Sequence, residues 1–388
     1  MKKGFVYLML VMFVITGVLT GCGTSNSKVV KIGFVGPLTG GNAAIGIGMK
    51  NSVDLAIKQA NASGKLPYKI ELVAVDDAGD PTTAVNAANK LIADPGVISV
   101  VAHFNSGAAL ATVPVFHKNG MPTVIAAAIH NDITKGGFKE ITRVITAADV
   151  QNEVAGNVAT KDWGLKKFAV IHDKTDYGKT NAEQFITSVK NNGGEVVSFD
   201  GISVGQQDFA ALLTIIKSNN PDMVFFGGVA TEAALIKRQM GELQMNAIFM
   251  SDSGILSETF NKIGGPAADG TLAHGIGKPL EDLPGGKDFM KAYADAKYAE
   301  PHEAYAPFAY DAANIIIKAL EKAGPDRVKM AEAIRGITSF EGILGETTFD
   351  DKGQTRLKII TTYISEGGKW VPYYRSGMKV IDKKIQKQ

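Results

Sequence analysis

The sequence predicts an α/β protein of two doubly wound lobes, each a parallel sheet with helices packed on it. Three observations predict this fold class. Short β-branched runs alternate with amphipathic stretches, the alternation restarts after about residue 148, and the 388 residues are too many for one usual compact core. Strands that alternate with helices form parallel sheets, because the right-handed crossover between parallel neighbours needs a helix.

The first half of the chain supplies four expected strands, at residues 29–35, 70–75, 97–102 and 123–125. After the first strand, apolar side chains recur with helical spacing at Met49, Val53, Ala56, Ile57 and Ala60. The next helix begins at Asp80-Pro81, because aspartate caps a helix N-terminus and proline suits the first helical position.

The second half repeats the pattern, with strands expected at residues 168–171, 195–199, 224–226 and 247–250. Helices are expected at residues 176–191 and 208–218 and from Thr231 onward, and Gly193-Gly194 ends the first of them. Two more helical patterns follow at residues 304–323 and 329–334. The last segment predicts a hairpin of residues 357–364 and 370–374 around Glu366-Gly367-Gly368.

The N-terminus has the pattern of a secretory signal. Lys2 and Lys3 precede an apolar run over residues 5–19, which is shorter than the roughly 20 residues that span a membrane. Leu19-Thr20-Gly21-Cys22 then resembles the lipobox of a bacterial lipoprotein, in which cleavage leaves a lipid on Cys22. We expect a signal peptide at residues 1–21, a tether at 22–28 and an extracytoplasmic, lipid-anchored protein. The alternative is a buried thiol after an uncleaved anchor.

The composition argues against several classes of protein. Hydrophobic residues make up 45% and charged residues 21%, and the formal net charge is +2, so nothing indicates a nucleic-acid partner. Cys22 is the only cysteine, so no internal disulfide is expected. The six histidines lack the spacing of a metal site, and no metal is expected.

Enzyme motifs of the doubly wound fold are incomplete in this chain. Gly46-Ile47-Gly48 is followed by Asn51 where a dinucleotide fingerprint needs its third glycine. Phe104 occupies the first glycine position of a Gly-x-Ser-x-Gly elbow around Ser106, and no Walker lysine motif occurs. We therefore expect neither a cofactor nor catalysis. A catalytic role stays open for three histidines, His103, His130 and His172.

Ligands of open parallel sheets bind beyond the carboxyl ends of the strands. Ser106 follows the third expected strand and starts a helix that carries Ala109, Val113 and Phe116. Helix N-termini offer free N–H groups and partial positive charge, which bind carboxylates. Ser106 is thus either a ligand contact or a plain N-cap that serves its own helix.

The loops after the strands, taken in order, resemble those of one known family. The chain is similar to the leucine/isoleucine/valine-binding type of ABC-transporter substrate-binding protein, which has the type I periplasmic binding fold. The resemblance covers about residues 29–365, and its motifs are weak singly but strong together. They include Ile32-Gly33-Phe34-Val35-Gly36-Pro37-Leu38-Thr39-Gly40, Val75-Asp76-Asp77-Ala78-Gly79-Asp80-Pro81 and His172-Asp173-Lys174-Thr175-Asp176-Tyr177-Gly178.

This resemblance implies two lobes joined by three crossover strands, near residues 146, 276 and 354. One lobe then comprises residues 29–146 and 277–354, and the other comprises residues 147–276 and 355–388. The lobes would close on a small-molecule ligand by a hinge motion, and the closed form would dock on permease subunits in the membrane. A monomer is expected.

The resemblance also implies ligand contacts. Ser106, with Gly107 beside it, falls where the family binds a ligand carboxylate, and Ala127 falls where the family offers backbone groups. Tyr177 matches a tyrosine of the second lobe that closes over the ligand. Tyr305 matches an aromatic residue that lines the pocket.

Other positions depart from the family. Ile129 replaces the hydroxyl residue near the ligand ammonium, and Ser253 replaces the acid paired with it, with Asp252 adjacent. Ile45 and Val229 replace two aromatic residues of the pocket. A buried ammonium without a carboxylate is costly, so the ligand is either an amino acid or an acid or amide without an amine. Asp252 would substitute for the missing acid if the loop shifts by one residue.

Three functions remain under consideration. The first is the solute-binding lipoprotein of an ABC importer, which binds a small amino acid or a related carboxylate or amide. The second is a ligand-sensing receptor of the same fold for a non-amino-acid carboxylate. The third is an enzyme, which needs a nucleophile with its base or a complete cofactor loop, and the sequence contains neither motif.

Overall fold

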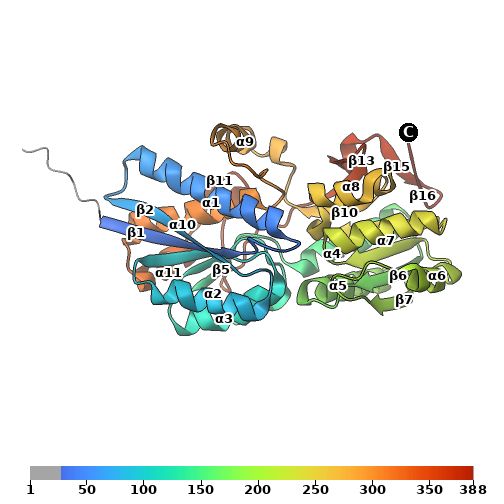
Figure 1. Cartoon of the computed structure of the whole chain (residues 1–388), viewed down its shortest axis with the longest axis horizontal. Helices are drawn as coiled ribbons and strands as arrows, with labels where there is room; N and C mark the ends of the chain where they lie inside the picture. The colour runs from blue at the N-terminus through green and yellow to red at the C-terminus, as the bar shows by residue number, and fades with distance from the viewer. Residues whose placement is uncertain (1–27, 388) are drawn as a thin grey trace, which may run out of the picture.

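The computed structural model of the protein describes residues 28–387. The expected signal peptide, most of the tether and the lipid-bearing Cys22 lie outside these residues. Within them, the chain forms two lobes that lie side by side, each a sheet with helices on both faces (Figure 1). The predicted fold class is confirmed. No helix between residues 28 and 387 is long and apolar enough to cross a membrane.

The first lobe contains a five-stranded sheet in the order β2-β1-β3-β4-β5, and every neighbouring pair is parallel. Its strands are β1 (Lys28–Gly36), β2 (Tyr68–Asp76), β3 (Val97–Ala102), β4 (Thr123–Ile125) and β5 (Ile141–Arg143). Its helices are α1 (Ala43–Ser63), α2 (Pro81–Ala93), α3 (Ser106–Lys118), α9 (Gly286–Asp295), α10 (Ala306–Ala323) and α11 (Arg327–Arg335). Apolar side chains of α1, α10 and α11 bury one face of the sheet, and those of α2 and α3 bury the other.

The second lobe contains a seven-stranded sheet in the order β14-β13-β10-β9-β8-β6-β7. Its strands are β6 (Lys167–His172), β7 (Glu195–Gly201), β8 (Met223–Gly227), β9 (Ile248–Asp252), β10 (Leu272–Ile276), β13 (Ile360–Glu366) and β14 (Lys369–Pro372). Its helices are α4 (Ala148–Asn157), α5 (Asp176–Asn191), α6 (Ala210–Ser218), α7 (Ala230–Glu242) and α8 (Glu258–Gly264). Helices α4 and α5 bury one face, and α6, α7 and α8 bury the other.

One edge of the second sheet differs from the expected all-parallel arrangement. β13 runs antiparallel to β10, and β14 runs antiparallel to β13. The expected hairpin is present, and its turn is made by Gly367 and Gly368, with φ of 58° and 75°. A two-residue turn of this kind requires both φ values to be positive and joins only antiparallel strands.

Several short elements were not expected from the sequence. They are β5, β10, the helices α4, α8 and α9, and the hairpin strands β11 (Phe340–Gly342), β12 (Gly345–Thr347), β15 (Met378–Ile381) and β16 (Lys384–Lys387). Strands of three or four residues contain too few side chains for an alternating pattern to stand out.

The expected helix starts have clear causes in the structure. Asp80 caps α2 by accepting a hydrogen bond from the backbone N–H of Thr83 at 2.8 Å, and Pro81 occupies the first helical position. α6 begins at Ala210, two residues later than expected, because the Asp208 carboxylate accepts a hydrogen bond from the Ala210 N–H at 2.9 Å.

The chain passes between the lobes three times, and the three passages are hydrogen-bonded to one another. At the end of β5, the Arg143 N–H donates to the Gly353 carbonyl at 2.8 Å, and the Thr355 N–H donates to the Arg143 carbonyl at 2.9 Å. After β10, the Gly277 N–H donates to the Ile359 carbonyl at 2.7 Å. These contacts place all three passages together along one side of the boundary between the lobes.

Candidate functional site

Six of the residues singled out from the sequence belong to one apolar core or pack against it. We call this group the interlobe cluster. It is formed by Ile45, Ala127, Ile129 and Tyr305 in one apolar core of the first lobe, with Tyr177 and Val229 of the second lobe packed against that core. Residues that are up to 260 positions apart in the sequence therefore form one continuous apolar surface.

Ser106 is the first residue of α3 and is fully buried. The helix is preceded by Asn105 in an extended conformation, so Ser106 is not the N-cap. The Ser106 Oγ accepts a hydrogen bond from the backbone N–H of His130 at 3.3 Å. Its own proton has no acceptor among residues 28–387, so the hydroxyl can donate to a bound anion at the helix N-terminus.

Gly107 lies where the two lobes touch. A Cβ atom at this position would be 2.9 Å from the Asp176 Oδ2 of the second lobe and 3.3 Å from the Pro81 Cγ of the first. A side chain at this position would therefore displace the Asp176 carboxylate. Gly107 thus lies close to the second lobe beside Ser106.

Tyr177 is the second residue of α5 and belongs to the wall of the second lobe. Thr175 caps the helix by accepting a hydrogen bond from the Gly178 N–H at 3.0 Å. The Tyr177 Oη accepts a hydrogen bond from the Gly254 N–H at 2.9 Å, which ties α5 to the turn after β9. Burial raises the pKa of Tyr177 well above its ordinary value, so its hydroxyl keeps a proton to donate.

Asp252 and Ser253 follow one another at the end of β9, and their side chains point in different directions. Ser253 lines a cavity between the lobes. Asp252 shares one face of β9 with Ile248 and Met250, whose side chains pack under α4 and α5. Of the two residues, only Ser253 is part of the lining of this cavity.

Asp252 is buried beside His274, its partner in register on β10. Both carboxylate oxygens of Asp252 and the Nε2 of His274 lack a hydrogen-bond partner in the part of the chain that the structure describes. Burial raises the pKa of Asp252 to about 8 and lowers the pKa of His274 to about 4. Both side chains are therefore mostly neutral near pH 7, because the buried environment disfavours either charge.

Two amides of α4 extend this buried polar group toward Tyr177. The Asn152 Nδ2 donates to the Asn181 Oδ1 at 2.7 Å, and the Asn181 Nδ2 donates to the Tyr177 carbonyl at 3.1 Å. The Gln151 Nε2 donates to the His274 carbonyl. Sequence reasoning missed this network because no helix was expected at residues 148–157. The two adjacent amide side chains of Gln151 and Asn152 were the available signal of a buried polar network.

Arg143 holds the loop that carries Ala127 and Ile129. Its side chain is buried, and its Nη1 donates to the Ala128 carbonyl at 3.4 Å and the His130 carbonyl at 2.6 Å. Its Nε donates to the Gln354 Oε1 at 2.5 Å on another passage between the lobes. Burial lowers the pKa of Arg143 to about 10, so it stays charged at neutral pH. Arg143 was not singled out from the sequence.

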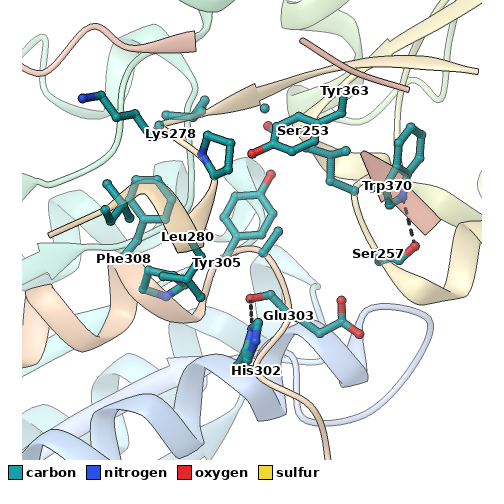
Figure 2. A pocket seen from close by; sticks show the side chains of 18 of the residues that line it. Ser253, Ser257, Lys278, Leu280, His302, Glu303, Tyr305, Phe308, Tyr363 and Trp370 are labelled. Carbon is teal, nitrogen blue, oxygen red and sulfur yellow. Dashed lines mark hydrogen bonds between the residues drawn. The ribbon is translucent and has the colours of Figure 1, made fainter. Parts of the chain in front are cut away.

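A cavity of about 350 Å³ opens between the lobes beside the interlobe cluster. Figure 2 shows Tyr305 at its centre, with Ser253 on one side and Glu303 on the other. The Ser253 Oγ is buried without a hydrogen-bond partner among the described residues. Burial raises the pKa values of Tyr177 and Tyr305, and the nearby Ser253 hydroxyl partly offsets this effect in both. Three hydroxyl groups therefore gather at this end of the cavity.

His103 takes part in a relay that resembles the machinery of an enzyme. Its Nδ1 lies 2.7 Å from the Asp77 Oδ2, and its Nε2 lies 2.8 Å from the Thr112 Oγ1. All three side chains are fully buried inside the first lobe, and the Thr112 hydroxyl also lies 2.8 Å from the Ala108 carbonyl of its own helix. A buried relay of this kind joins β3 to α3 and supports the position of Ser106.

The site as a whole can bind an anionic or polar group and enclose an apolar one. Ser106 and Tyr177 each offer a hydroxyl proton from opposite lobes, and Ile45, Ile129 and Val229 supply apolar walls. Within residues 28–387, no group of three or more histidine, cysteine, aspartate or glutamate side chains could hold a metal ion.

Comparisons with known proteins agree with this geometry. The profile of the periplasmic binding protein family matches residues 29–369. Leu/Ile/Val-binding protein homolog 2 of Brucella abortus (strain 2308) is 33% identical, over 87% of this chain and 91% of its own length.

Solved structures give the same result. A leucine-binding protein of Thermotoga maritima is 30% identical with a TM-score of 0.81, covering 88% of this chain and 97% of that one. The branched-chain amino acid transporter substrate-binding protein of Streptococcus pneumoniae, in complex with isoleucine, is 26% identical with a TM-score of 0.80, covering 88% and 98%. The relatives are named as binding proteins, and the chain belongs to the periplasmic binding protein family, in its leucine/isoleucine/valine-binding-protein-like type I class.

Proposed function

We propose that the protein is the extracytoplasmic solute receptor of an ABC importer and acts as a monomer without catalysis. It binds a small amino acid, or a related carboxylate or amide, between its lobes. The interlobe cluster carries this proposal, because Tyr177 and Val229 of one lobe pack on the apolar core of the other. The similar protein of Streptococcus pneumoniae is a transporter substrate-binding protein, which supports the importer role.

Binding couples to closure of the lobes about the three chain passages near residues 146, 276 and 354. In this proposal, residues 29–146 and 277–354 move as one body, and residues 147–276 and 355–388 move as the other. A ligand that contacts Ser106 and Tyr177 together can do so only when the lobes are closed, so it shifts the population toward that state. Permease subunits in the membrane then recognise the closed form.

The ligand carboxylate or amide oxygen binds at the N-terminus of α3. The Ser106 hydroxyl donates to it, with Gly107 and the backbone at Ala127 beside it. Tyr177 closes over the ligand from the second lobe, while Ile45, Ile129 and Val229 surround its apolar part. The Arg143 guanidinium fixes the loop that presents Ala127 and Ile129, so the first-lobe side of the site is formed before the ligand arrives.

The N-terminal segment attaches the receptor to the membrane in this proposal. Residues 1–21 are removed as a signal peptide, and Cys22 carries the lipid. Replacing the cysteine (Cys22→Ser) is expected to release the protein into the soluble fraction of cells. Retention of that variant in the membrane fraction would indicate an uncleaved anchor instead.

The test of the binding function begins with a thermal-shift screen of amino acids, simple carboxylates and amides, because a ligand of the folded form raises the melting temperature. For the best ligand, Ser106→Ala is expected to weaken binding by about 1–3 kcal/mol in calorimetry, since a charged acceptor loses its donor. Asn105→Ala is the matched control, because Asn105 precedes the same helix without a side-chain capping bond. Equal affinity of both variants and the wild type would remove Ser106 from the site.

A further inference from the structure

The cavity beside Tyr305 lies next to the chain passage that follows β10. Segments of both lobes build it: the loop before α10, the passage after β10, the start of α8 and the hairpin β13–β14. Most of its wall is apolar, including Leu256, Ile276, Leu283, Phe308, Tyr363 and Trp370. Ser253 and Tyr305, two residues of the proposed ligand site, also belong to this wall.

Glu303 differs from every other charged residue of this wall. Glu258, Lys278 and Glu281 are exposed to solvent, whereas Glu303 is only 9% exposed. Within residues 28–387 its carboxylate forms no ion pair. A buried carboxylate without a cation is costly, and this cost points to a partner that comes from outside the chain.

The charged groups around Glu303 compensate the negative charge of its carboxylate only in part. Burial raises the pKa of Glu303 to about 7, and the negative charges of Glu258 on α8 and Glu300 on its own loop act in the same direction. The Glu258 backbone N–H and the Lys262 ammonium on α8 lower the pKa only in part. His302, the neighbouring side chain, directs its Nδ1 to the Glu303 carbonyl at 3.3 Å and not to the carboxylate.

The backbone holds Glu303 in an unusual conformation. Its φ is +52°, in the left-handed region that residues with side chains seldom adopt. Its neighbour His302 packs edge-on against Phe289 and Tyr293, and the Ala306 N–H donates to the Glu303 carbonyl. Such local strain persists where the surroundings enforce it and is common at binding sites.

We propose that Glu303 binds the cationic nitrogen of a ligand whose carboxylate lies at Ser106 and whose chain runs past Tyr305 into this cavity. The ligand class is amino acids with the amine several carbons away from the carboxylate. This proposal rests on the function proposed above. It explains how the chain recognises an amine although Ile129 and Ser253 have replaced the partners of an α-ammonium.

Calorimetry with three probes tests this assignment directly. The probes are 5-aminopentanoate, pentanoate, which lacks the amine, and leucine, which has its amine on the α-carbon. We expect the wild-type protein to bind 5-aminopentanoate at least about 30-fold more tightly than pentanoate, as for a desolvated charge pair. Leucine is expected to bind more weakly than 5-aminopentanoate.

Glu303→Gln should abolish the preference for the amine and leave the affinity for pentanoate unchanged. Glu300→Gln is the matched control, because it removes the same charge from an exposed position on the same loop. It should retain the full preference. A preference that survives in Glu303→Gln with the variant folded overturns the assignment.

A proton measurement on the wild type keeps the test valid if Glu303→Gln does not fold. The ligand cation requires the ionised carboxylate, so 5-aminopentanoate should release part of a proton near pH 7 and bind more tightly as the pH rises from about 6 to about 8. Pentanoate should not show this release. Titrations in buffers of different ionisation enthalpy measure it, and equal release for both probes overturns the assignment.

The outcomes separate this inference from the proposed function. If pentanoate or leucine binds as tightly as 5-aminopentanoate, the role of Glu303 is wrong and the receptor function stands. If none of the three probes and no compound of the thermal-shift screen binds, the role of Glu303 and the receptor function are both wrong.

Discussion

The two lobes bring different kinds of surface to the same site. The wall of the first lobe is apolar and closely packed around Ile45, Ala127 and Ile129, and its loop is held by the Arg143 guanidinium. The second lobe instead buries Asp252 and His274, with polar atoms that have no partner in the described part of the chain. Buried polar atoms without a partner also occur in the first lobe, for example at Asn105 beside Ser106, but those of Asp252 and His274 belong to a pair of titratable side chains on adjacent strands.

This difference matters because each buried polar group without a partner costs about 1–3 kcal/mol. Such groups persist in natural proteins mainly where function needs them. We infer that the first lobe supplies the subsites for the charged groups of the ligand, at Ser106 and Glu303, and that the second lobe determines how closure depends on pH. The following predictions test this division of roles.

The largest effect is expected from removing the support of the first-lobe wall. Arg143→Ala leaves the buried carbonyls of Ala128 and His130 unpaired and should lower the free energy of unfolding by about 3 kcal/mol or more. It should also weaken ligand binding, because His130 donates its N–H to Ser106. Urea unfolding and calorimetry measure the two effects.

Arg327→Ala is the control for this experiment. The Arg327 side chain also donates to backbone carbonyls, those of Val97 and Asp94 at 2.9 Å each, but away from the site. It should cost stability and leave ligand affinity unchanged. If Arg143→Ala likewise leaves affinity unchanged, Arg143 serves only the fold.

A smaller effect is expected from Asp252 in the second lobe, on how the free energy of unfolding depends on pH. Because the pKa of Asp252 is raised to about 8, the folded state keeps a proton that the unfolded state has lost, and stability falls as the pH rises toward 8. The lowered pKa of His274 has the opposite effect, because it makes the stability of the protein fall as the pH drops below about 6.5. The effect of Asp252 is therefore clearest between about pH 6.5 and pH 8.

Asp252→Asn should make the fall in unfolding free energy between about pH 6.5 and pH 8 shallower by up to about 1.4 kcal/mol per pH unit. The asparagine amide can also donate to the Asn152 Oδ1, which lacks a partner among the described residues. The exposed Asp351→Asn should leave the slope unchanged. Equal slopes for wild type and Asp252→Asn in urea unfolding would show that Asp252 is ionised in the folded protein.

The sequence predicted the framework of the first lobe and of α5 well, because caps and periodicity are local signals. The bounds of α5 agree with the expected residues 176–191. The direction of β13 was not predictable in the same way, since a strand's own pattern does not reveal the route by which the chain returns to a sheet. The sequence resemblance led to Ser106, Tyr177 and Tyr305, which the structure places around the boundary between the lobes.

The residues that sequence reasoning missed are polar and buried. Arg143 ends a three-residue strand, where a charged side chain is ordinarily expected to reach solvent. Glu303 lies in a loop, and neither its burial nor its positive φ has a local sequence signal. Asp252 and Ser253 could not be told apart, because the alternation of side chains along a strand assigns faces only when the strand's end is known.

The smallest effect is expected at the hydroxyl that the second lobe presents to the site. Tyr177→Phe removes the acceptor of the Gly254 N–H and should cost about 1 kcal/mol of stability. Tyr373→Phe is a matched control, because the Tyr373 hydroxyl accepts the Val380 N–H at 2.8 Å in the same lobe, away from the ligand. Only Tyr177→Phe should also weaken ligand binding, by several-fold in calorimetry. If both variants keep the wild-type affinity, the Tyr177 hydroxyl serves only the turn after β9, and Ser253 is the second-lobe hydroxyl that remains at the cavity.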